Sequence, residues 1–157
     1  MVLKLYENTY ITLDEAQQYF DERFNSEVWI EAADEDKQKA LITASKRIDR
    51  LNFIGEKAVR GQEMEFPRTF CAVDAAAVPT DVKEAVCEEA IELLAHSGSV
   101  HLINQELGIQ SVSLGGGSVS YKDIKLGGLL SKEAYKLVSK WLQKGFDIKN
   151  PEFAEAD

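Results

Sequence analysis

Apolar residues recur every three or four positions in the front half of the chain, a spacing typical of helices with one buried face. The first such segment begins at Thr12, because Thr12 followed by Glu15 is a capping-box pattern. Its apolar stripe continues to about Phe24. The second segment reaches about Leu51, and Asp34 is expected to cap it by accepting a hydrogen bond from its first turn. Two amphipathic helices are therefore predicted here.

Two more helices and a hairpin are predicted in the rear half. One helix is expected to start with Thr80 as its cap, and the other to cover residues 132–143 with Ser131 as its cap. Between them, polar and apolar residues alternate on both sides of a run of three glycines, over residues 111–121. Alternation around a glycine turn is typical of a β-hairpin.

The apolar faces of the predicted helices indicate the core. Trp29 is the largest apolar side chain in the front half and lies in a predicted helical turn over residues 27–33. Because buried aromatic side chains commonly dominate core energetics, Trp29 is interpreted as a core anchor rather than a platform for stacking a ligand. The expected core comprises Phe20, Trp29, Leu41, Ile48, Val86 and Leu93.

Residues 52–79 have no clear periodicity and are predicted to form a long arm. Within this arm, residues 62–68 are expected to be extended, which places Met64 and Phe66 on the same side. Pro67 removes a backbone donor, so the run can be an edge strand or a packed arm but not a central strand. The aromatic side chains of the arm need an apolar surface to pack against, on this domain or on another subunit.

The chain has 157 residues, of which 45% are hydrophobic, and can bury a continuous core as one domain. The predicted fold class is mainly α, a small bundle of about four helices with a long extended arm and a β-hairpin. The domain is expected over residues 1–144, and the tail over 145–157 is expected to dock onto a partner. No apolar run approaches the roughly twenty residues that span a bilayer, so no membrane partner is predicted.

The net charge of the chain limits which partners it can bind. Lys and Arg total 18 against 27 Asp and Glu, which gives a net charge of −9 and opposes binding of a phosphate backbone by the chain as a whole. The densest positive cluster follows Asp34 but is interrupted by acidic residues, so it is interpreted as a solvated helix face. The helix after Thr80 is predicted to carry an acidic face, including Glu88 and Glu89, opposite its core face.

Few groups in the sequence could carry catalysis. Cys71 and Cys87 have neither C-x-x-C spacing nor a neighbouring histidine, and His96 and His101 would not share a helical face as metal ligands. The glycines at 115–117 are not followed by the Lys-Ser or Lys-Thr pair of a phosphate-binding loop. No catalytic residue, metal site or cofactor is therefore predicted, and an enzyme is not favoured.

An ordered set of short motifs runs along the chain: Tyr10 to Ala16, Trp29 and Asp34, Lys39 to Ser45 with Ile48 and Asp49, Gln62 with Phe66 to Arg68, and Val78 and Pro79 with Val82, Lys83 and Ala85. This set resembles one family of tailed-phage proteins, the head-tail connectors or adaptors. Some members of that family carry the label DnaT-like single-stranded DNA-binding protein. The order and spacing match over about residues 8–96, and the predicted hairpin fits the usual continuation.

The resemblance implies a structural protein of the virion neck, assembled in the bacterial cytoplasm. It would form a ring, commonly dodecameric, beneath the portal protein, join the capsid to the next neck or tail protein, and let DNA pass without sequence-specific binding. The intersubunit contacts of the arm would involve Phe53, Gln62, Phe66, Pro67 and Arg68, the last as an ion-pair donor. Docking on the portal would involve Trp141, Phe146, Ile148 and Phe153.

The alternative is a single-stranded DNA-binding protein, which requires aromatic platforms beside a basic groove. The sequence has the aromatic residues, but its charge pattern shows no basic groove. The sequence therefore favours the connector over the DNA-binding protein.

Overall fold

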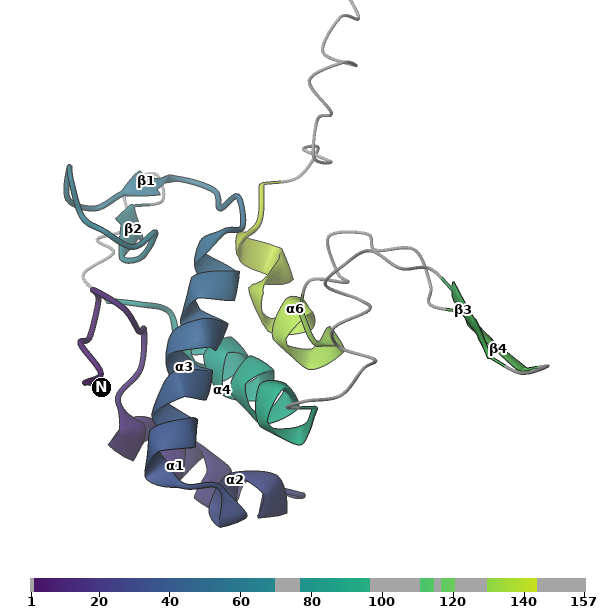
Figure 1. Cartoon of the computed structure of the whole chain (residues 1–157). Coiled ribbons are helices and arrows are strands. Elements are labelled where there is room, and N and C mark those ends of the chain that lie inside the picture. Colours follow the sequence, from purple (N-terminus) through teal and green to yellow (C-terminus); the bar gives the residue numbers. More distant parts are fainter. Residues whose placement is uncertain (1, 70–76, 97–110, 115–116, 121–129, 144–157) are drawn as a thin grey trace, which may run out of the picture.

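The computed structural model describes residues 2–69, 77–96, 111–114, 117–120 and 130–143, and five α-helices lie within these ranges (Figure 1). The helices are α1 (Leu13–Glu22), α2 (Glu27–Glu31), α3 (Asp34–Asp49), α4 (Thr80–Ala95) and α6 (Lys132–Val138), with a 3₁₀ helix, η2 (Ser139–Trp141), after α6. Within these ranges, no helix is both long enough and apolar enough to cross a membrane.

Two small antiparallel strand pairs complete the described structure. β1 (Glu56–Lys57) pairs with β2 (Arg68–Thr69), and β3 (Ser111–Leu114) pairs with β4 (Gly117–Ser120). The second pair is the hairpin that alternation around the glycines predicted. The mainly helical fold class with a hairpin is thus confirmed.

α4 is the central helix of the bundle. It packs most extensively against α3 and α6, and it also contacts α1 and α2. Phe20 of α1 stacks on Trp29 of α2, with ring centroids 4.3 Å apart, and both side chains are buried. Of the residues expected in the core, those buried are Phe20, Trp29, Leu41, Ile48 and Val86, while Leu93 is partly buried and packs at the edge.

Two of the predicted helix caps are correct. The hydroxyl of Thr12 accepts a hydrogen bond from the backbone N–H of Glu15 at 3.2 Å, and the Glu15 carboxylate accepts one from the backbone N–H of Thr12. The side chain of Ser131 caps α6. The last helix is shorter than predicted, because α6 ends at Val138 and tightens into η2.

The other two predicted caps are wrong by one residue. Asp34 and Thr80 are the first residues of α3 and α4, and the capping positions belong to Ala33 and Pro79, neither of which caps through a side chain. At α4, the carbonyl of Pro79 accepts the first hydrogen bonds, from the N–H groups of Val82 and Lys83. Asp34 instead places its charge in the first turn of α3, where the helix dipole favours an acid.

The predicted apolar stripe of the first helix extends too far. α1 ends at Glu22, and the side chain of Phe24 is 88% exposed rather than buried. Arg23 has extended backbone and Asn25 has a positive φ of 59°, so the chain turns away from the helix axis. The Arg23 guanidinium holds this turn by donating hydrogen bonds to the carbonyls of Phe24 and Asn25, at 3.0 and 2.8 Å.

Candidate functional site

The arm packs against its own domain through aromatic side chains. Phe66 is buried between Tyr10 and Phe53, with ring centroids 5.9 and 4.7 Å away in edge-to-face geometry. Met64 is buried as well, as its shared side with Phe66 in an extended run predicted. The part of the arm over residues 62–68 is therefore a packed arm that ends in the edge pairing of β1 with β2.

The buried side chain of Arg68 binds the backbone at the start of the arm. Its guanidinium donates hydrogen bonds to the carbonyls of Ile54 at 2.9 Å and Gly55 at 2.6 Å, and it forms an ion pair with Glu65. A third carbonyl, that of Phe53, lies 3.3 Å from the same guanidinium. Arg68 is 7% exposed, and all of these partners belong to its own chain. An additional ion pair to another subunit stays a prediction.

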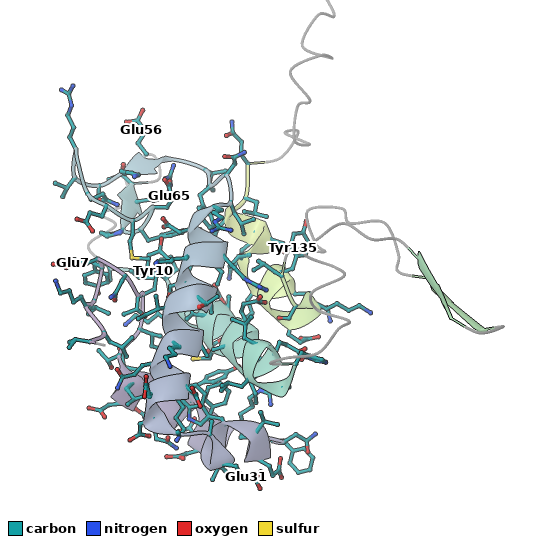
Figure 2. The ribbon with its side chains drawn as sticks, viewed as in Figure 1. Glu7, Tyr10, Glu31, Glu56, Glu65 and Tyr135 are labelled. Atoms are coloured by element: carbon teal, nitrogen blue, oxygen red, sulfur yellow. The ribbon has the colours of Figure 1, made fainter. Side chains whose placement is uncertain are left out.

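A second polar anchor joins the arm to α3 and the N-terminal segment (Figure 2). The Tyr10 hydroxyl donates to Asp49 and accepts a hydrogen bond from the N–H of Phe66 at 3.3 Å. Asp49 also accepts a hydrogen bond from the N–H of Glu65 at 2.7 Å. Burial, followed by the hydrogen bond to Asp49, raises the pKa of Tyr10. Sequence patterns did not reveal this anchor, because its members are far apart along the chain.

Gln62 ties the tip of the arm into a turn. Its side-chain carbonyl accepts a hydrogen bond from the N–H of Val59 at 3.0 Å, and its own N–H donates to the carbonyl of Val59 at 3.2 Å. Its side-chain amide donates to the carbonyls of Met64 and Pro67, at 2.8 and 3.0 Å. Gln62 thus links the turn that starts at Val59 to the backbone of residues 64–67.

Two acids on α4, Glu88 and Glu89, were predicted to face solvent but are buried. Glu88 is 7% exposed and accepts hydrogen bonds from Arg23, at 2.6 and 2.9 Å, and from the Tyr19 hydroxyl at 2.6 Å. Burial opposes the charged form of Glu88, but the hydrogen bonds from Arg23 and Tyr19 outweigh it and lower its pKa. The predicted acidic face fails here because Arg23, the residue after α1, places a cation over α4.

Glu89 is even more deeply buried, at 2% exposed. It accepts a hydrogen bond from Arg47 of α3 at 3.0 Å and another from the backbone N–H of Ser131 at 2.7 Å. The two adjacent acids of α4 therefore connect it to α1, to α3 and to the start of α6. Their role in the described structure is to hold helices together.

The described residues offer few groups for chemistry. In the ranges that the structure describes, no group of three or more His, Cys, Asp or Glu side chains could hold a metal ion. Cys87 is buried, and burial raises the pKa of its thiol, which makes the nucleophilic thiolate scarce. Cys71 and His101 lie outside the described residues.

Lysines line the exposed face of α6. Lys132, Lys136 and Lys140 follow one another at four-residue spacing and are exposed. Lys136 pairs with Glu133 at 2.9 Å, and Lys140 pairs with Asp81 and lies 5.5 Å from the ring centroid of Trp141. We call these three residues the α6 lysine face. Lys132 and Lys136 belong to α6, and Lys140 belongs to η2, which directly follows it.

Trp141 was predicted to dock on a portal. It is partly buried and packs against the core, and its carbonyl accepts a hydrogen bond from the N–H of Ile54 at 2.9 Å. Trp141 therefore contacts the start of the arm, at Ile54. The other predicted docking residues, Phe146, Ile148 and Phe153, lie outside the described residues.

An apolar groove of about 540 Å³ lies between α2, the N-terminal half of α3 and the last turn of α4. Its apolar lining comprises Val28, Ala32, Ala40, Leu93 and Leu94, and its polar lining comprises Glu31, Asp36, Lys39 and Thr43. Lys39 is held by Glu35 at 2.9 Å and by Asp36 at 3.9 Å. We call this cavity the acidic-rimmed groove.

A sequence model of one protein family, described as "Putative DnaT-like ssDNA binding protein", matches residues 4–154. The chain belongs to this family. The family description agrees with the alternative that the sequence analysis ranked second, and it implies a non-catalytic binding protein. Nothing in the family match supports the phage connector role. No curated protein and no solved structure matches the chain.

Proposed function

We propose that the chain is a non-catalytic protein that binds single-stranded DNA through the α6 lysine face. The family match supports DNA binding as the task. The lysine face supplies the surface, because its cations at four-residue spacing are separated by roughly 6 Å along the helix axis. Such a row can follow a flexible phosphate backbone without reading its sequence.

The contact would combine charge with stacking. Lys140 lies over the ring of Trp141, so a cation and an aromatic face are offered together, the pairing that sequence-tolerant DNA-binding surfaces use. Tyr135 is partly buried on the same helix. The bases would thus stack on aromatic faces while the phosphates meet lysines.

The net charge of −9 sets how strong this binding can be. Three lysines neutralise few phosphates, so the observed binding constant should fall with salt at a logarithmic slope of about −2. A steep slope would require a larger basic surface than the described residues offer. We therefore expect binding that is weak and moderately dependent on salt.

The test is fluorescence anisotropy of a labelled oligothymidylate at several salt concentrations. The triple variant Lys132→Gln, Lys136→Gln, Lys140→Gln should bind at least about tenfold more weakly and show a slope near zero. A matched control, Lys4→Gln, Lys46→Gln, Arg50→Gln, removes the same charge from exposed positions elsewhere and should change affinity far less. Equal losses in both triple variants, or no binding by the unmodified chain at low salt, would contradict the proposal.

A second candidate is the structural connector, and a different observation favours it. Several large apolar side chains project into solvent, including Phe24 at 88%, Val59 at 62% and Ile30 at 61% exposed. Exposed apolar groups of this kind suit contacts between protein subunits. An acidic wall would also let DNA slide, because it gains nothing from counterion release. In this role the chain would form a ring that joins a portal to the next neck or tail protein.

Electron microscopy of the purified chain, alone and with a portal protein, tests the connector. Rings that bind the portal would support it, and their absence in both samples would contradict it. Deleting residues 145–157 should leave the domain folded and abolish assembly on the portal, since the predicted docking residues of the tail lie there. The two candidates also differ on DNA, because the connector alone predicts no binding at physiological salt.

A further inference from the structure

The tip of the arm is a preformed turn that displays two side chains to solvent. Val59 is 62% exposed and Arg60 is exposed. Gly61 has the positive φ, 88°, that a type II turn requires at its third position, and the hydrogen bonds of Gln62 close the turn. Lys57 is ion-paired with Glu65, whereas Arg60 forms no ion pair with any described residue.

Such a turn has the properties of a binding element. Its backbone is already fixed by hydrogen bonds, so little conformational entropy remains to be lost on binding. Arginine is also enriched among the residues that carry the binding energy of interfaces. The turn therefore offers, in a set geometry, one apolar side chain and one cation that no described residue pairs with.

The acidic-rimmed groove is the complementary surface. Its apolar lining can take a side chain such as valine, since its volume of about 540 Å³ exceeds that of a single side chain. At its rim, Glu31 is exposed and forms no ion pair with any described residue, and Lys39 is already engaged by two acids. The groove therefore presents an apolar floor beside a carboxylate that pairs with none of the residues in the described ranges.

The turn and the groove lie at opposite ends of the molecule. The turn connects β1 to β2, beyond the C-terminal end of α3, whereas the groove is lined by α2 and the N-terminal half of α3 (Figure 1). Figure 2 shows the same separation between Glu56 of β1 and Glu31 of α2. α3 has 16 residues, about 24 Å of helix, so the two surfaces cannot meet within one chain.

We infer that a second copy of this chain occupies the groove: the Val59–Arg60 turn of one copy inserts into the acidic-rimmed groove of the next. Val59 enters the apolar floor, and Arg60 pairs with Glu31 at the rim. Because donor and acceptor surfaces are different and lie at opposite ends, the contact is heterologous and repeats head to tail. It does not rest on DNA binding, and the α6 lysine face stays outside it.

The decisive experiment is a charge swap, measured by sedimentation velocity of the full chain over a range of concentrations. The unmodified chain should form species larger than dimers as its concentration rises. Arg60→Glu and Glu31→Lys should each weaken association at least about tenfold. The double variant, with both changes on one chain, should recover association, because every contact again joins opposite charges.

Matched controls carry the same charge changes at exposed positions outside both surfaces. Lys46→Glu matches Arg60→Glu, and Glu22→Lys matches Glu31→Lys. Both controls should associate as the unmodified chain does. The inference would be overturned if the controls weaken association as much as Arg60→Glu and Glu31→Lys do, or if the double variant does not recover association. It would also be overturned if the unmodified chain stays a monomer at its highest soluble concentration.

A mixing experiment tests the head-to-tail arrangement. One variant, Val59→Asp with Arg60→Glu, loses the turn surface, and a second, Thr43→Trp, fills the groove at an exposed lining position. Neither should associate alone, but their mixture should form one-to-one dimers and nothing larger. An unmodified chain that stops at dimers would instead indicate a symmetric contact and overturn the head-to-tail arrangement. Circular dichroism of each variant separates lost contact from lost folding.

Discussion

The arm and the helical bundle are stabilised in different ways. In α3 and α4 the backbone satisfies its own hydrogen bonds, so side chains such as Leu41 and Val86 are free to pack apolar surface. In the described part of the arm, the ladder between β1 and β2 is two residues long, so polar side chains also bind the backbone, and Arg68, Gln62 and Asp49 do so. These polar residues thus bind the arm to its own domain, and the contacts to other subunits that the family resemblance implied stay a prediction.

The largest effect should come from the aromatic anchor of the arm. Phe66→Ala should destabilise the fold by about 3–5 kcal/mol, because it removes a buried ring between Tyr10 and Phe53. Urea unfolding followed by circular dichroism measures this loss. A loss below about 1 kcal/mol would show that the arm is not part of the cooperative fold.

Arg68→Ala should rank second, at about 2–3 kcal/mol, because carbonyls at the start of the arm lose their charged donor. Arg68→Lys should restore only part of this, since an ammonium cannot reproduce the fork of a guanidinium. The same urea experiment measures both variants. If Arg68→Ala unfolds like the unmodified chain but fails to assemble, Arg68 acts between subunits, as the sequence suggested.

The ion pair between Glu88 and Arg23 should make the free energy of unfolding depend on pH in the acidic range. The pKa of Glu88 in the folded chain lies below the ordinary value of 4.5, so its contribution is present above that pH and is lost as the pH falls through the folded pKa. Glu88→Gln should cost about 1–2 kcal/mol at neutral pH and flatten the fall in stability below pH 4.5. Thermal unfolding at a series of pH values measures both effects. An unchanged acid profile in Glu88→Gln would contradict this assignment.

The smallest effect should come from Phe24. Phe24→Ala should change the free energy of unfolding by less than about 0.5 kcal/mol, because its ring is 88% exposed and packs little on the domain. A larger loss would place Phe24 in the core, as the helical spacing suggested. Arg23→Ala should by contrast destabilise the fold, because it removes the partner of Glu88.

Local sequence determined the helices, the hairpin and two caps. These follow from neighbouring residues: Thr12 with Glu15 forms the capping box, Ser131 caps α6, and alternation around glycines gives β3 and β4. The same local rules misjudged Phe24, since they cannot tell where a helix ends when the next turn is held by a distant pair. That pair, Arg23 with Glu88, joins residues 65 positions apart.

By itself, then, the sequence determined a mainly helical fold with a hairpin, but left open whether the arm packs on its own domain or on another subunit. Its motifs resembled the phage connectors, of which some members carry the DnaT-like label that the matching family model bears. Only the tertiary structure decided which polar residues are internal. Glu88 and Glu89 look like solvent-facing acids along their helix, and become buried partners once α1 and α3 bring arginines to them. The reason is physical: a buried charge is tolerated only where a distant segment supplies its partner, and the order of residues along one helix does not contain that information.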